Sequence, residues 1–105
     1  MEQRNTMHKL ILNSKVFYIP PNLVILTNVN PDIYKELCFN QQYVVKSNIN
    51  ENTFKNFIDY LVYSKIPDIN KENFIEYDLI SNEFDRMKDL IYIYDNYREN
   101  NNQII

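Results

Sequence analysis

The 105-residue chain contains no glycine, no tryptophan and no alanine, and it has a single cysteine and a single histidine. Without glycine the chain has neither a P-loop nor the G-x-G-x-x-G turn of dinucleotide-binding proteins, because both need glycine where the backbone approaches phosphate. A single histidine excludes any site built on two histidines, including the H-E-x-x-H zinc helix. These absences exclude the common nucleotide-binding enzymes, and we expect no metal and no cofactor.

Charge and hydropathy exclude two further classes of partner. The formal net charge is −3, from 11 basic and 14 acidic residues scattered over both halves of the chain. No basic stripe is present for a phosphate backbone, so we expect no nucleic-acid partner. The longest apolar runs, such as residues 23–26, are far shorter than the roughly 20 residues of a membrane helix, and no hydrophobic signal region opens the chain. With one cysteine and no internal disulfide, the sequence predicts a cytoplasmic or nuclear protein that does not bind membranes.

Asparagine, isoleucine and tyrosine are the abundant residues, with 17, 14 and nine copies. All three have AT-rich codons, so this bias alone carries no functional information. An apolar content of 45% is ample for the core of one small domain. We expect a single domain over residues 1–105, with its core over residues 8–97 and a polar, frayed tail over residues 98–105.

The first third of the chain predicts a β-hairpin. Two β-branched and aromatic runs, residues 9–12 and 16–19, are separated by a short polar gap that is typical of a hairpin turn. Asn13 is expected in the left-handed conformation that glycine usually supplies. Beyond the hairpin, residues 22–29 form an apolar segment long enough for about two helical turns. Residues 43–49 predict a short third strand at or near an edge of the sheet.

Asparagines mark the expected starts of three helices. Asn30, followed by Pro and Asp, has the sequence of a capped helix start. Asn50 precedes the clearest amphipathic pattern, whose apolar residues recur at i, i+3, i+4 and i+7: Phe54, Phe57, Ile58 and Leu61. Asn70 precedes a helix that reaches Phe84, and a last helix repeats this spacing over residues 87–94. The order of hairpin, two short helices, strand and three helices predicts an α+β fold with about five helices packed on a small sheet.

No group of residues in the sequence has the pattern of a catalytic site. His8, the only histidine, is expected at the surface beside the first strand. Cys38 lies on the apolar face of its helix and is expected to be buried, since a free cysteine behaves as a small hydrophobe. The carboxylates Asp78, Asp85 and Asp89 pair along helical faces, but a general acid and base need a cleft that sets them apart. We expect no catalysis, and a small enzyme with an unrecognised carboxylate site is the alternative from another class.

Tyrosines on the outer faces of the helices favour a protein-interaction module. The apolar stripes leave no room for all of Tyr60, Tyr63, Tyr92, Tyr94 and Tyr97 in the core. Aromatic side chains with a polar tip are enriched at protein interfaces, although coding bias is an equal explanation for any single tyrosine. We predict that a protein partner is bound by helix faces and strand edges, through Phe39, Gln41 and Tyr43 beside the second helix, and Tyr92 and Tyr97 on the last.

Two segments in the first half of the chain resemble motifs of the BTB/POZ family. Residues 9–19 are similar to the family's opening strand-turn-strand, in which a short polar turn separates the strands. Residues 30–37 resemble its S-P-x-F-x-x-L helix start, with Pro31, Tyr34 and Leu37 in the matching places.

Two segments in the second half extend this resemblance. Residues 50–64 are similar to the family's s-x-x-x-F-x-x-x-L-x-Y-L-Y-t-g segment, with Lys65 where glycine is usual. Residues 79–84, together with Leu90, are similar to the L-x-x-A-x-x-F…L segment that follows it. The resemblance spans residues 9–97, and it is nearest to the BTB-like domains that precede ankyrin repeats in protist proteins.

The resemblance implies a protein-interaction module that acts as a dimeriser, or as an adaptor that presents a bound partner to a cullin ubiquitin ligase. Fewer than ten residues precede the hairpin, so we expect the shorter architecture of elongin C or of the potassium-channel tetramerisation domain. Residues 39–43 lack the hydrophobic-x-Glu motif associated with cullin binding. The alternative is a self-assembling domain, dimeric or tetrameric, of a larger ankyrin-repeat protein; neither function requires a small-molecule substrate.

Overall fold

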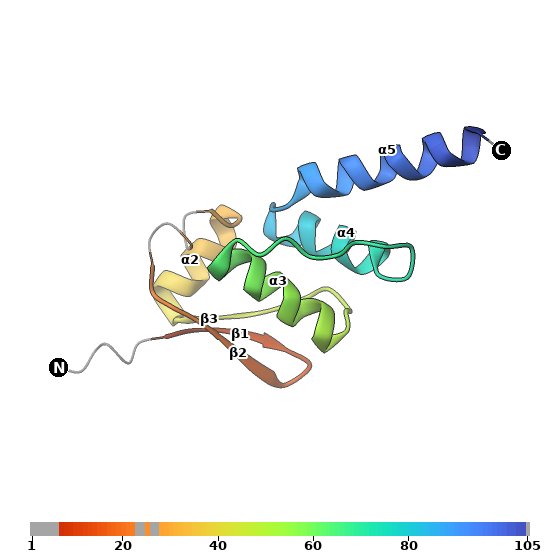
Figure 1. Cartoon of the computed structure of the whole chain (residues 1–105). Coiled ribbons are helices and arrows are strands. Elements are labelled where there is room, and N and C mark those ends of the chain that lie inside the picture. The colour runs from red at the N-terminus through yellow and green to blue at the C-terminus, as the bar shows by residue number, and fades with distance from the viewer. Residues whose placement is uncertain (1–6, 23–24, 26–27, 105) are drawn as a thin grey trace.

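A three-stranded sheet forms the base of the molecule, and helices pack against one side of it (Figure 1). This computed structural model describes residues 7–22, 25 and 28–104, with side chains as far as residue 96. The elements in these ranges are β1 (His8–Leu12), β2 (Lys15–Ile19), α2 (Pro31–Asn40), β3 (Gln42–Val44), α3 (Glu51–Tyr63), α4 (Phe74–Phe84) and α5 (Lys88–Ile104). The predicted α+β class is confirmed. Four helices lie within these ranges, and the predicted helix over 22–29 falls partly outside them.

The hairpin turn consists of two residues, Asn13 and Ser14, whose φ angles are positive at 52° and 69°. This conformation matches the right-handed twist of the two strands, and it is usually built with glycine at the second position. The register pairs Leu12 with Lys15 across the turn. The left-handed conformation of Asn13 is confirmed, whereas the same conformation at Ser14 was not predicted.

The third strand lies beside the first and runs parallel to it, so the order in the sheet is β2-β1-β3. A parallel neighbour needs a crossover connection, which here contains α2. The predicted edge position of the third strand is confirmed. Its predicted length is wrong, because β3 covers only Gln42–Val44, whereas residues 43–49 were expected. After β3 the main chain instead donates hydrogen bonds to the carboxylate of Glu83 on α4.

The core lies between the inner face of the sheet and the helices α3 and α4. Phe54 and Phe57 of α3 and Phe84 of α4 are completely buried. The ring centroids of Phe57 and Phe84 are 4.9 Å apart in an edge-to-face arrangement, which aromatic rings favour. Burial of each such side chain contributes about 1.5–3 kcal/mol to the free energy of unfolding. The predicted apolar stripe of α3 is therefore confirmed as its buried face.

Helix caps account for two of the predicted boundaries. Asn30 and Asn50 each accept a hydrogen bond from the main-chain N–H two residues further on, at 2.7 and 2.8 Å. Asn70 was predicted to start the next helix, and this is wrong by three residues. A turn at 71–73 follows Asn70, which caps that turn instead, and α4 begins after Asn73 without a side-chain cap.

Two predictions about burial are wrong. His8 is only 7% exposed, because β1 begins one residue earlier than the sequence indicated. His8 therefore shares the inner face of the strand with Leu10 and Leu12, since every second residue of a strand points to the same side. Cys38 is exposed. Helix α2 turns Ile33 and Leu37 toward the core, and the residue after Leu37 lies about 100° further around the helix.

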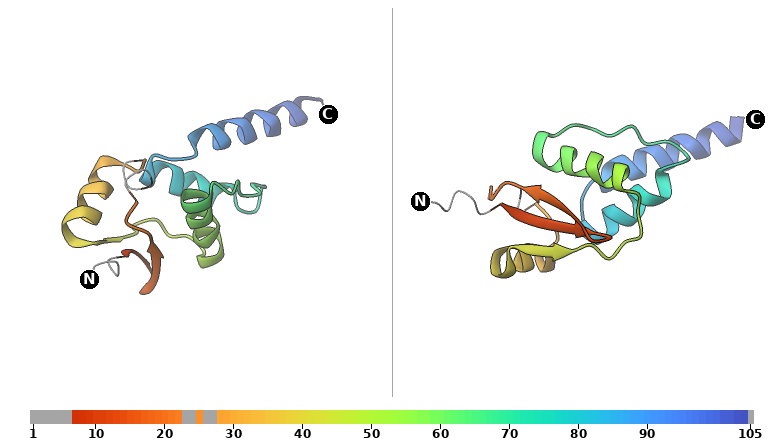
Figure 2. Two further views of the ribbon diagram at one scale, coloured as in Figure 1. Left: turned by 60° about the vertical axis from the view of Figure 1, so that its left-hand side comes forward. Right: turned by 90° about the horizontal axis from the view of Figure 1, so that it is seen from below.

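The last helix is longer than predicted and stands away from the rest of the molecule (Figures 1 and 2). Residues 98–103 were expected to fray, yet α5 continues to Ile104. No proline or glycine interrupts it, and Arg, Glu and Gln are good helix formers, which explains the continuation. The first turn of α5 and the residue before it attach the helix to the body, through the buried side chains of Ile91 and Met87.

Candidate protein-interaction surfaces

Tyr43, one of the five predicted binding residues, is buried and bonded within the protein. Its hydroxyl group donates to the carboxylate of Glu83, with 2.5 Å between the oxygens. The same carboxylate accepts the main-chain N–H groups of Lys46 and Ser47 at 2.8 and 2.9 Å, and the Ser47 hydroxyl at 2.6 Å. We call these four residues the Glu83 knot. It fastens β3 and the loop after it to α4, so Tyr43 is not part of an exposed surface.

The Glu83 knot has clear electrostatic consequences. Burial alone would raise the pKa of Glu83, but hydrogen bonds from Ser47, Tyr43 and Lys46 outweigh burial and lower it below its ordinary value. The pKa of Tyr43 is raised, first by burial and second by its hydrogen bond to Glu83. The knot thus holds a carboxylate next to a neutral phenol, and both side chains border a hollow of about 310 Å³ that Asp32 and Glu36 of α2 also line.

Phe39 and Gln41 lie at the end of α2, apart from the other predicted binding residues. Phe39 is 81% exposed, more than any other large apolar residue in the described ranges. Gln41 ends the helix in the left-handed conformation, and its N–H donates to the carbonyl of Leu37. The side chain of Gln41 is exposed, so this end of α2 presents one aromatic and one amide group to solvent.

Tyr92 lies on α5, at the opposite end of the chain from the hairpin, and is 69% exposed. It lines a groove between α4 and α5 of about 280 Å³, together with Asp78, Asn82, Lys88, Ile91 and Asp95. Tyr97, the last predicted binding residue, has a side chain outside the described residues. Tyr92, on α5, therefore lies apart from Phe39 and Gln41 at the end of α2.

Three further exposed apolar residues on the same two helices were not predicted. Ile75 and Leu79 lie one turn apart on α4, and Ile93 follows Tyr92 on α5. The first and third of these are 69% and 62% exposed. Their sequence signal is weak, because α4 is apolar on nearly every side and its buried face is not distinct before the structure is seen. We call Ile75, Leu79, Tyr92 and Ile93, with the groove between the helices, the α4–α5 surface.

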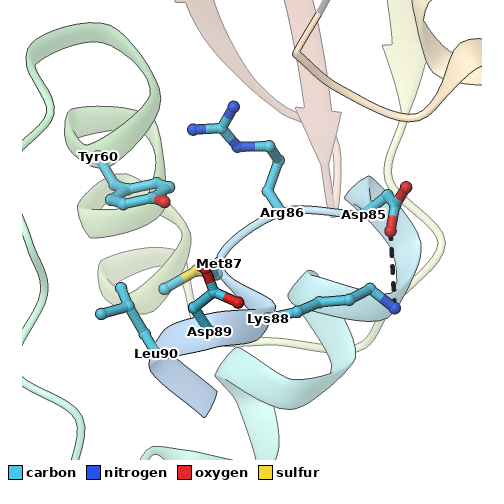
Figure 3. Close-up of a pocket in the computed structure, with 7 residues that line it drawn as sticks. All are labelled: Tyr60, Asp85, Arg86, Met87, Lys88, Asp89 and Leu90. Atoms are coloured by element: carbon cyan, nitrogen blue, oxygen red, sulfur yellow. Dashed lines mark ion pairs between the residues drawn. The ribbon is translucent and has the colours of Figure 1, made fainter. Parts of the chain in front are cut away.

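Two of the three carboxylates considered for catalysis, Asp85 and Asp89, border a hollow of about 310 Å³ at the joint of α4 and α5 (Figure 3), whereas Asp78 lines the groove with Tyr92. Asp85 lies 3.6 Å from the ammonium group of Lys88, on the side of the hollow away from Asp89. The guanidinium group of Arg86 stacks over the ring of Tyr60, 5.3 Å from its centroid. Both carboxylates are exposed, whereas a general acid needs a carboxyl group shielded from water. The hollow does contain Asp85 and Asp89, so its existence does not by itself remove the carboxylate hypothesis.

Ligand-binding features of other kinds were sought in the residues that the structure describes. No three or more His, Cys, Asp or Glu residues among them lie close enough to hold a metal ion. Within the same ranges, every helix is too short or too polar to cross a membrane.

Comparisons of this chain with models of protein families, with curated proteins and with solved structures found no match. The α+β class rests on the structure itself. The resemblance to BTB/POZ domains rests on the four sequence segments quoted above, and any function drawn from it belongs to the proposal that follows.

Proposed function

We propose that this chain is a BTB/POZ-like protein-interaction domain, an adaptor or an oligomerisation domain without catalysis, which binds its partner through the α4–α5 surface. The order of elements supports the proposal, with a hairpin first, a helix that starts at Pro31 and a helix that ends before Ser64. These are the elements on which the sequence resemblance rests. The proposed compartment is the cytosol or the nucleus, because the free thiol of Cys38 is exposed and such thiols persist in reducing compartments.

The exposure of α5 is the observation that carries this proposal. Ile91 is the buried apolar residue of the described part of α5, while Tyr92 and Ile93 of this helix, and Ile75 and Leu79 of α4, are exposed. Two helices that follow one another in the chain thus expose four large apolar side chains, and exposed apolar groups of this kind mark interaction sites where they are contiguous. Full burial of one such side chain against a partner contributes roughly 1.5–3 kcal/mol, so the four together supply about 6–12 kcal/mol before the cost of association.

The polar lining of the α4–α5 groove gives the partner's chemistry. Asp78 and Asp95 lie on opposite helices of the groove, and Lys88 stands at its end. The groove therefore offers a partner polar as well as apolar contacts. The partner is another protein or a second copy of the domain, and a cullin is one candidate for the first.

The proposal is tested with the double variant Tyr92→Ser/Ile93→Ser and a matched control, Ile66→Ser. Ile66 is 68% exposed, as apolar as Ile93, and lies in the loop after α3, away from both helices. Proteins captured by the full chain from cell extract are quantified by mass spectrometry, and light scattering against concentration reports self-assembly. The double variant should lose the captured partner or the self-assembly at least tenfold, while the control keeps it. Equal retention by all three proteins would contradict the α4–α5 surface.

A further inference from the structure

The outer edge of β2 is open, and the hydrogen-bond pattern of the sheet shows which main-chain groups point outward there. Lys9 donates its N–H to the carbonyl of Gln41 at 2.9 Å, and the carbonyl of Ile11 accepts the N–H of Val45 at 2.8 Å. Lys9 and Ile11 therefore direct their main-chain groups toward β3 and away from β2. In an antiparallel ladder, the residues directly across from such residues also point their N–H and C=O groups out of the pair.

Those residues across the ladder are Tyr18 and Val16. Their N–H and C=O groups face the free edge of the sheet, and no hydrogen bond within the described part of the chain uses them. Edge strands in soluble proteins are commonly protected by charged residues, proline or bulges. Here Lys15 and Pro20 stand only at the two ends of the strand, so its middle keeps two donors and two acceptors available to another strand.

A groove runs along this edge, because α3 lies beyond β2 on the side away from β1. The right-hand view of Figure 2 shows β2 between β1 and α3. The groove has a volume of about 410 Å³, with Phe17, Tyr18 and Pro20 on the strand side and Ile58, Val62 and Tyr63 on the helix side. An added strand would thus have a main-chain partner on one flank and apolar side chains under one face, which is how sheet edges next to helices bind extended peptides.

The charges around this edge are not balanced. The segment from Met7 to Asn22 carries Lys9 and Lys15 and no carboxylate. Lys15 lies 3.5 Å from Glu51, and within the groove Lys55 lies 4.0 Å from Asp59. Of these three lysines, only Lys9 has no ion pair among the described residues, and it lies beside Tyr18 on the outer face of the sheet. An acidic residue on the outer face of an added strand would complement it.

We propose that an extended peptide segment of another protein adds to the sheet as a fourth strand along β2. Its main chain pairs with Val16 and Tyr18, its apolar side chains on one face enter the groove against α3, and an acidic side chain on the other face pairs with Lys9. This peptide site shares no residue with the α4–α5 surface and stands or falls independently of it. A second copy of this chain's β2 is less suited, since α3 overhangs the edge and two such helices would compete for the space above the joined strands.

The first experiment selects a phage-displayed library of random linear octapeptides on the full chain. The expected consensus alternates apolar residues and includes one Asp or Glu. In a synthetic copy of the selected peptide, N-methylation at one set of alternate residues should abolish binding and N-methylation at the other set should be tolerated, because only alternate N–H groups of a strand face its neighbour. A library without an enriched sequence, or methylation with no alternation, would overturn the proposal.

The second experiment locates the bound peptide with variants of the edge. Val16→Pro removes one outward N–H without touching the β1–β2 ladder, and edge strands tolerate proline at such positions. Val16→Thr keeps the N–H with a similar side chain. We expect binding to weaken about tenfold in V16P and to stay within about twofold in V16T. Equal binding by V16P would place the peptide elsewhere, and a concentration-dependent dimer that V16P abolishes would assign the edge to a second copy; either result overturns the proposal.

A third measurement tests the charge. The peptide with its acidic residue changed to Asn, and the variant Lys9→Gln, are compared singly and together. The proposal expects each change alone to weaken binding severalfold and the two together to cost little more than one, because they remove the same ion pair. Additive losses would show that Lys9 does not contact the acidic residue.

Discussion

The two edges of the sheet differ, although they flank the same central strand. The β3 edge is three residues long, and the Glu83 knot binds Tyr43 and the two residues after Val45 to α4. The β2 edge is five residues long, and its outward main-chain groups meet no partner in the described residues. A protein of this size can close one edge with side-chain hydrogen bonds and leave the other open, so the edges are separable by mutation.

The largest expected effect comes from opening the closed edge. In Glu83→Ala the hydroxyl of Tyr43 and three donors of Lys46 and Ser47 lose their acceptor. We expect the free energy of unfolding to fall by roughly 3 kcal/mol, since unpaired buried polar groups cost about 1–3 kcal/mol each and some regain water. Urea denaturation measures this. Glu76→Ala is the control, because Glu76 accepts only one exposed N–H among the described residues, that of Asn50 at 3.1 Å. If E83A lost no more free energy of unfolding than E76A, the proposed role of the Glu83 knot would be wrong.

Acid should destabilise the fold in two stages, first through His8 of the central strand and then through Glu83 of the closed edge. Burial lowers the pKa of His8 below 6.5, against a hydrogen bond with the Leu37 backbone that raises it, and the pKa of Glu83 is below 4.5. Because the unfolded chain binds these protons more tightly than the folded chain, the stabilisation is complete above the unfolded values and is lost as pH falls through the folded ones.

This predicts two steps in the urea midpoint as pH falls, one that begins below pH 6.5 and one below pH 4.5. His8→Gln should flatten the first step and Glu83→Gln the second. A midpoint that stays constant from pH 7 to pH 4 in the unaltered protein would contradict the buried histidine.

A smaller, stabilising effect is expected at the hairpin turn that leads into the open edge. Ser14 occupies the left-handed region at φ 69°, in which a residue with a Cβ atom is less stable than glycine. Ser14→Gly should raise the free energy of unfolding by about 1 kcal/mol, while Ser14→Ala should not. Ser14 is not among the residues proposed to contact the peptide, so S14G should leave the affinity of the peptide for β2 unchanged. Calorimetry measures this affinity.

The smallest expected effect concerns the contact between β2 and α3. The ion pair of Lys15 and Glu51 is 3.5 Å long, and both side chains are more than half exposed. Lys15→Gln should therefore cost only about 0.5 kcal/mol, and the difference from the unaltered protein should vanish in 1 M salt. Lys35→Gln, at an exposed lysine without an ion pair in the described residues, is the matched control. A loss of more than about 1 kcal/mol in the free energy of unfolding would mean that this pair holds the hairpin in place.

Local signals in the sequence predicted the parts of the fold that depend on neighbours in the chain. The hairpin, the caps Asn30 and Asn50 and the buried stripe of α3 each follow from fewer than about fifteen consecutive residues. The strand β3 was found but not its length or its direction, because parallel pairing depends on how a crossover returns the chain. Start positions were the least accurate, as the shift from Asn70 to Asn73 shows.

The candidate surfaces were harder to predict than the fold. Tyr43 has the sequence context of an exposed edge residue, and its burial depends on Glu83, which lies 40 residues away. Cys38 was assigned to the wrong face of a ten-residue helix, because Tyr34 and Leu37 alone do not fix the direction of the core. Tyr92 was predicted to be exposed, and it is, since Ile91 occupies the buried side of this part of α5. The open backbone at Val16 and Tyr18 has no signature in the sequence.

The absence of glycine has a cost that extends beyond the hairpin. In the described part of the chain, six residues other than glycine have positive φ, among them Ser14, Gln41 and Ser64, and each conformation of this kind costs on the order of 1 kcal/mol where a Cβ atom is present. The natural sequence is therefore not the most stable one for its own backbone. Glycine placed singly at the exposed corners Ser14 and Ser64 should raise the melting temperature by a few degrees each without altering the residues proposed to contact a partner, so thermal tolerance and recognition can be varied separately in this protein.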